Sequence, residues 1–99
     1  MPDRIVRRIG ITVMVKIWFK VIKDNKIQKQ YVYENDEKFT YSHFGDYISA
    51  GCYALDEATP VLIRSHIMNF AKYNTVKFTP DDFVESVPFD KLTVENLDR

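Results

Sequence analysis

The chain has 99 residues and a mass of 11.7 kDa, which fits one domain with a single core. Hydrophobic residues make up 45% of the sequence and aromatic residues 14%, a composition that excludes a mainly disordered chain. The single cysteine, Cys52, excludes an intrachain disulfide framework, and no Cys or His cluster has the spacing of a zinc site. We therefore expect a reduced, cytoplasmic protein without a metal or cofactor.

The charge is unevenly distributed along the chain. Residues 1–33 carry eight basic and two acidic side chains, a balance of +6, and the remaining 66 residues therefore carry −6. This asymmetry is typical of a basic binding surface, or of a basic hairpin that packs on an acidic layer of its own fold or of a second subunit. The net charge of zero favours the packing alternative, because a dedicated duplex-binding domain is usually basic as a whole.

A β-hairpin is predicted near the N-terminus. Bulky apolar residues occupy every second position from Ile11 to Val21, which is typical of a half-buried strand. Lys16 and Lys20 interrupt this run, so it is no membrane helix, which needs about 20 apolar residues. A two-residue turn at Asp24–Asn25 would lead into a second strand over residues 27–33. No membrane partner is expected.

The turn also predicts the register of the hairpin. Ile22 should face Ile27, Trp18 should face Tyr31 and Lys16 should face Tyr33, with Lys20 opposite Lys29 and Ile17 opposite Val32. One face then carries the aliphatic side chains that pack on helices. The other gathers a cationic and aromatic group, which is the main candidate for a partner or nucleic-acid surface. Its members are Lys16, Trp18, Lys20, Lys29, Tyr31 and Tyr33.

The rest of the chain predicts two helices and further strands. A short third strand is expected over residues 39–41, and Ser42 is expected to cap a helix in which Gly51 allows a close contact. Thr59 and Pro60 have the pattern that begins a second helix, which would end near Asn74. Residues 75–78 are expected to form a strand.

The C-terminal part is less regular. Residues 79–82 resemble a third helix start, with the acids Asp81, Asp82 and Glu85 favoured by the helix dipole and with Phe83, Val84 and Val87 facing the core. Residues 91–94 fit either an edge strand or an irregular tail. The prediction is an α+β fold of order β-β-(β)-α-α-β-α, a small antiparallel sheet packed on two helices. Residues 1–10 are expected to form a flexible basic arm, and residues 11–99 the single domain.

Few residues are candidates for chemistry. His43 and Cys52 are nine residues apart, roughly 13 Å along a helix, which is too far for proton transfer. Cys52 lies on the apolar stripe, where a thiol behaves as a small hydrophobe. His66 lies between Ile63 and Ile67 on the buried stripe of the second helix and is expected to be a core or interface residue.

The leading hypothesis is a non-enzymatic binding or regulatory protein that acts through protein–protein contact. It would be a homodimer, with the aromatic sheet face or an edge strand as its interface. The alternative is a single-stranded nucleic-acid binder that uses the same six residues of the hairpin. A third hypothesis is a small enzyme with a histidine-containing pocket around His43, Asp46 and His66.

Overall fold

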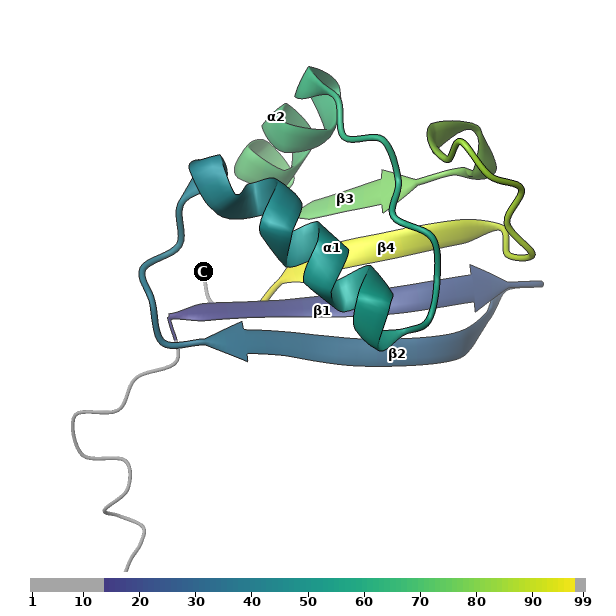
Figure 1. The fold of residues 1–99 in the computed structure, drawn as a ribbon, viewed down its shortest axis with the longest axis horizontal. Coiled ribbons are helices and arrows are strands. Elements are labelled where there is room, and N and C mark those ends of the chain that lie inside the picture. The colour runs from purple at the N-terminus through teal and green to yellow at the C-terminus, as the bar shows by residue number, and fades with distance from the viewer. Residues whose placement is uncertain (1–13, 98–99) are drawn as a thin grey trace, which may run out of the picture.

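The computed structural model describes residues 14–97, and the predicted arm at residues 1–10 lies outside this part of the chain. A four-stranded antiparallel sheet, in the order β2-β1-β4-β3, is covered on one face by two helices (Figure 1). The elements are β1 (Val15–Lys23), β2 (Lys26–Asn35), α1 (Phe44–Ala54), α2 (Arg64–Tyr73), β3 (Thr75–Phe78) and β4 (Lys91–Asn96), with the short 3₁₀ helices η1 (Tyr41–His43) and η2 (Pro80–Asp82). The predicted α+β fold is confirmed.

The central strand β1 has the predicted two-residue periodicity. Val15, Ile17, Phe19 and Val21 are buried under the helices, and the residues between them face the open side of the sheet. β4 lies beside β1 and buries Leu92 and Val94, the edge strand β3 buries Val76 and Phe78, and the rings of Phe44 and Phe70 add to the same core from the helices. One core therefore unites the sheet and both helices.

The hairpin turn is as predicted, but the register beyond it is not. Asp24 and Asn25 have φ values of 53° and 65°, the left-handed pair that a tight two-residue hairpin turn requires. Ile22 pairs with Ile27 as expected, but a β-bulge follows between Val21 and Ile22. A bulge adds one residue to one strand and so shifts every later pair by one position.

The predicted pairs past the bulge are therefore wrong. Trp18 pairs with Val32 instead of Tyr31, and the neighbouring pairs are Lys16 with Glu34, Ile17 with Tyr33 and Lys20 with Gln30. Because paired residues of neighbouring strands share a face, the shift moves Val32 to the open face of the sheet. It moves Tyr31, Tyr33 and Lys29 to the helix-covered face.

α1 packs closely on β1. It begins after η1, whose N-cap is Thr40, and the Thr40 side chain accepts a hydrogen bond from the Ser42 N–H. The predicted strand over residues 39–41 is therefore absent, and the capping residue is Thr40 instead of Ser42. A β-carbon at Gly51 would lie 2.3 Å from Cζ of the buried Phe19 ring. The prediction that Gly51 allows a close contact is confirmed.

α2 begins four residues later than predicted. Residues 59–63 are not helical, and the N-cap is Ile63, with extended backbone, instead of Thr59. The Ile63 N–H donates to Nδ1 of His66, 3.1 Å away, so a histidine does the work usually done by Glu or Gln at this helix position. The helix ends at Asn74, as predicted, and Asn74 has a left-handed conformation.

The C-terminal elements also differ from the prediction. The third helix is reduced to the single turn η2, after which Phe83 is buried but Val84 is exposed. Residues 91–96 form β4, which pairs with both β1 and β3, so the strand alternative for residues 91–94 is the correct one and the strand is central. The basic hairpin contacts acidic residues within the fold: Lys20 pairs with Glu95, and Lys29 with Glu57.

Candidate interaction surfaces

The six-residue hairpin group does not lie on one surface. The bulge divides it into Lys16, Trp18 and Lys20 on the open face, and Lys29, Tyr31 and Tyr33 on the helix-covered face. The expectation of a single cationic and aromatic face is therefore wrong, although neither half is thereby excluded as a contact surface.

On the open face, each of the three side chains has a partner within the sheet. The Trp18 Nε1–H donates to Oε1 of Gln30 at 3.0 Å, and Nζ of Lys20 lies 4.2 Å from the centre of the indole ring. Lys20 also pairs with Glu95 at 3.9 Å, and Lys16 pairs with Glu34 at 3.7 Å. Because the indole is already covered by an ammonium group, it offers a poor stacking platform for a base.

On the helix-covered face, the other three residues join β2 to α1. Lys29 donates to the carbonyl of Leu55 at 3.0 Å and pairs with Glu57 at 2.6 Å. The Tyr33 ring lies 5.7 Å from that of Tyr47, and its hydroxyl accepts a hydrogen bond from the Asn35 side chain. Tyr31 remains exposed. These contacts stabilise the fold and leave Lys29 little freedom to bind a phosphate.

His43, Asp46 and Cys52, the candidate catalytic residues of α1 and its start, do not form a reactive group. His43 and Asp46 are exposed near the start of α1, whereas Cys52 is buried on the core side of that helix. Burial raises the pKa of the Cys52 thiol to about 11, and the negative charge of Glu57 adds to this shift. A thiol with so high a pKa is a poor nucleophile at neutral pH.

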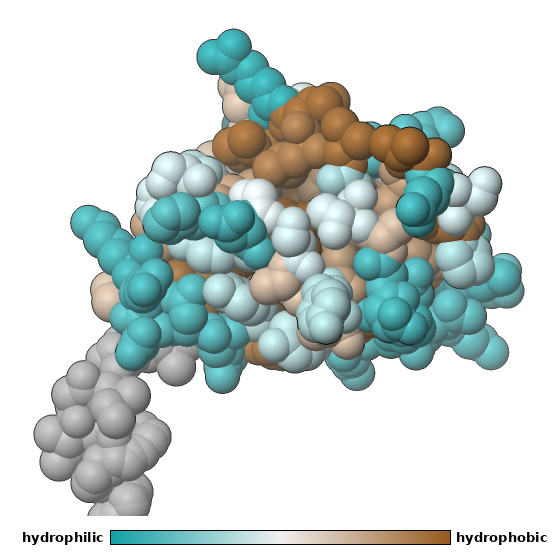
Figure 2. Space-filling view, viewed as in Figure 1, coloured by the Kyte–Doolittle hydropathy of each residue, from teal (hydrophilic) through white to brown (hydrophobic). Residues whose placement is uncertain are grey.

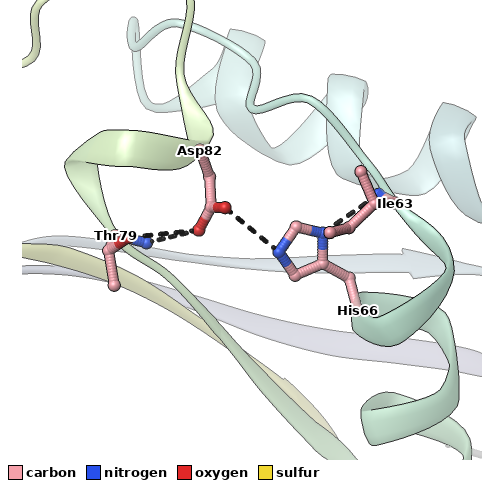
Figure 3. A network of polar contacts seen from close by, with 4 residues as sticks. All are labelled: Ile63, His66, Thr79 and Asp82. Carbon is pink, nitrogen blue, oxygen red and sulfur yellow. Dashed lines mark hydrogen bonds and ion pairs between the residues drawn. The ribbon is translucent and has the colours of Figure 1, made fainter.

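His66 belongs to a polar network that joins the start of α2 to η2 (Figure 3). Its Nδ1 accepts the Ile63 N–H, so the ring proton lies on Nε2, which faces Oδ1 of Asp82 at 3.4 Å. Oδ2 of Asp82 accepts hydrogen bonds from the Thr79 N–H at 2.8 Å and from its hydroxyl at 3.4 Å. Both ring nitrogens of His66 are thus engaged, and the ring packs against Phe78.

The same network holds an exposed apolar patch. The Val61 N–H donates to the Asp82 carbonyl at 2.7 Å, which fixes residues 59–63 beside η2. Val61 and Ile63 are 48% and 51% exposed, and Val84, two residues after Asp82, is 89% exposed. We call these three residues the apolar patch; Figure 2 shows a hydrophobic area along the top of the view, over the start of α2.

Sequence reasoning missed this patch because it placed Val84 in the core. That assignment assumed a continuous helix after Pro80, in which Val84 would follow Phe83 on the inner stripe. One signal was present: Val84 is followed by Glu85 and Ser86 and then by Pro88, too few residues before a proline for a stable helix. Val61 and Ile63 were likewise assigned to a helix that begins only at Arg64.

Comparisons with protein families, with curated proteins and with solved structures find no match for this chain. Within residues 14–97 there is no pocket, and no group of three or more His, Cys, Asp or Glu side chains is placed to hold a metal ion. No helix in that range is long and apolar enough to cross a bilayer.

Proposed function

We propose that this chain is a non-enzymatic protein-binding domain whose partner protein docks on the apolar patch. The observation that carries the proposal is the exposure of three branched aliphatic side chains on two segments that a polar network holds together. Contiguous exposed apolar surface with a polar surround is typical of protein interaction sites. Branched side chains on a braced backbone lose little conformational entropy on binding, which favours affinity.

The side chains that could take part in catalysis support a binding role over an enzymatic one. Both nitrogens of His66 are used in structural contacts, and Cys52 is buried with a raised pKa. The single-stranded nucleic-acid alternative has less support than the sequence suggested. Its six residues are divided between two faces, and Lys16, Lys20 and Lys29 all pair with carboxylates of the chain.

A matched pair of variants tests the proposal. Val84→Asp places a charge in the patch, and Tyr53→Asp places the same charge on α1 at a residue that is 88% exposed, nearly the same as Val84. Tagged wild type and both variants are used to enrich proteins from cells of the source organism, with quantitative mass spectrometry as the readout. We expect a defined protein to be retained by wild type and Tyr53→Asp, and lost with Val84→Asp.

The affinity of that protein, measured with purified components, should weaken at least about tenfold with Val84→Asp, since a central apolar contact is worth more than about 1.4 kcal/mol. Equal retention by wild type and Val84→Asp of every enriched protein would contradict the proposal. So would a loss that occurs equally with Tyr53→Asp.

A further inference from the structure

Within residues 14–97, the outer edge of β2 presents unpaired strand backbone over most of its length. β2 has ten residues, contains no proline and is hydrogen-bonded to β1 on one side; in the described part of the chain no strand lies on its other side. The edge strand at the opposite side of the sheet, β3, has four residues. Edge strands are ready templates for pairing with another strand, and a longer edge offers more hydrogen bonds.

The register shows which groups of β2 point outward. The Leu97 N–H donates to the Lys16 carbonyl, so in β1 the even-numbered residues bond to β4 and the odd-numbered ones, from Ile17 to Val21, bond to β2. Their partners in β2 are residues 29, 31 and 33. The N–H and C=O groups of the intervening residues, Gln30, Val32 and Glu34, therefore point away from the sheet.

The regular part of this edge is centred on Val32. Gln28 has no partner in β1 because of the bulge, so the regular pairing runs from Lys29 to Asn35, and Val32 is its midpoint. A second copy of β2, antiparallel and related by a two-fold axis at Val32, would place Gln30 opposite Glu34 and Tyr31 opposite Tyr33. Such isologous pairing is the usual geometry of a homodimer.

The side chains fit this pairing. The Gln30 Oε1 already accepts from Trp18, which leaves its amide N–H groups to donate to the carboxylate of Glu34 in the other copy. Tyr31 and Tyr33 would form aromatic cross-strand pairs, which stabilise a sheet by roughly 0.2–1 kcal/mol each. No like charges oppose one another between residues 29 and 35. An axis at Glu34 would instead bring two carboxylates together.

We infer that two copies of this chain associate through β2, antiparallel about Val32, to form one continuous eight-stranded sheet. This interface is distinct from the apolar patch, so self-association and partner binding are separate properties. The dimer would present two apolar patches, and a partner with two binding sites would gain affinity from that arrangement.

The test exploits the two-fold axis. Val32→Lys places two ammonium groups opposite each other, and Val32→Glu places two carboxylates there, while each variant leaves the monomer intact because Val32 is exposed on the open face. By light scattering after size exclusion, at loading concentrations up to about 100 μM, we expect wild type to have twice the 11.7 kDa chain mass and each variant to be monomeric.

Mixing the two variants should restore the dimer, because Lys and Glu then face each other across the axis. Circular dichroism of each variant should match that of wild type, which separates loss of association from loss of fold. A monomeric wild type would overturn the inference, and so would dimeric single variants or a mixture that stays monomeric. Val84→Asp should remain dimeric, so failure of the apolar-patch proposal leaves this result unaffected.

Discussion

The two helices cover the same face of the sheet but are held by different kinds of contact. α1 buries five positions, among them Phe44, Ile48 and Gly51, and lies directly on β1. In α2 the buried positions are His66 and Phe70, and the start of the helix is held by the hydrogen bond from the Ile63 N–H to His66 and by the contact of His66 Nε2 with Asp82 instead. A helix held by apolar packing buries the side chains that make the contact. A helix held by polar contacts, such as those of His66 and Asp82 at the start of α2, allows nearby apolar side chains to remain exposed. This difference is why the candidate docking surface lies beside α2.

The largest effect is expected where α1 meets β1. Gly51→Ala would force the buried Phe19 ring to move, because the added β-carbon would lie 2.3 Å from it. We expect the free energy of unfolding to fall by about 3 kcal/mol, the upper end of the usual cost of overpacking a core, in urea denaturation. Gly45→Ala, with open space around its β-carbon, should gain up to about 1 kcal/mol from helix propensity. Equal effects of the two changes would contradict the close packing of α1.

A smaller loss of stability is expected when the polar contacts of His66 and Asp82 at the start of α2 are removed. His66→Ala and Asp82→Ala should each lower the free energy of unfolding by about 1–3 kcal/mol, because each leaves a partner without its hydrogen bond. The double variant should cost less than the sum of the two, with a coupling of at least about 0.5 kcal/mol. Strict additivity in this cycle would show that His66 and Asp82 do not act together.

The free energy of unfolding is expected to depend on pH because of the buried Cys52 thiol in α1. The pKa of Cys52 is raised from 9.0 to about 11 in the folded chain, so the unfolded thiol ionises first as the pH rises. The contribution to stability is complete below pH 9 and is lost between about pH 9 and 11. Stability curves of wild type and Cys52→Ala should diverge over that interval, with wild type losing more. Parallel curves would contradict the raised pKa.

The smallest effect on stability is expected at the apolar patch. Val84 and Tyr53 are both almost fully exposed, so Val84→Asp and Tyr53→Asp should each change the free energy of unfolding by less than about 0.5 kcal/mol. Thermal denaturation of the two variants beside wild type checks this. A loss of more than about 1 kcal/mol in Val84→Asp would mean that Val84 is part of the core after all.

The sequence predicted those parts of the fold that follow from local periodicity. The alternation along β1, the left-handed turn at Asp24 and Asn25, and the end of α2 at Asn74 all depend on neighbouring residues, and all are confirmed. The α+β class follows from them, because a strand with one apolar face needs helices to cover it. The close contact at Gly51 was also predicted, but its partner, the Phe19 ring, became known only from the structure.

The errors arose where tertiary contacts override local preference. Nothing in residues 26–30 indicates that Gln28 is the extra residue of a bulge, yet this one residue reverses the faces of Tyr31 and Tyr33. Thr59 and Pro60 have a helix-start pattern, but the Val61 N–H is used by the Asp82 carbonyl, which holds the segment outside the helix. The six hairpin residues therefore lie on two faces of the sheet instead of one, because their placement depends on the bulge.

Hydrogen exchange tests the docking surface most directly. Exchange is measured on wild type alone and in complex with the protein that wild type retains and Val84→Asp loses. We expect new protection at residues 61–63 and around Val84, with none on the exposed side of α1 near Tyr53. Protection confined to α1 or to the open face around Trp18, with the apolar patch unchanged, would contradict the proposed docking site.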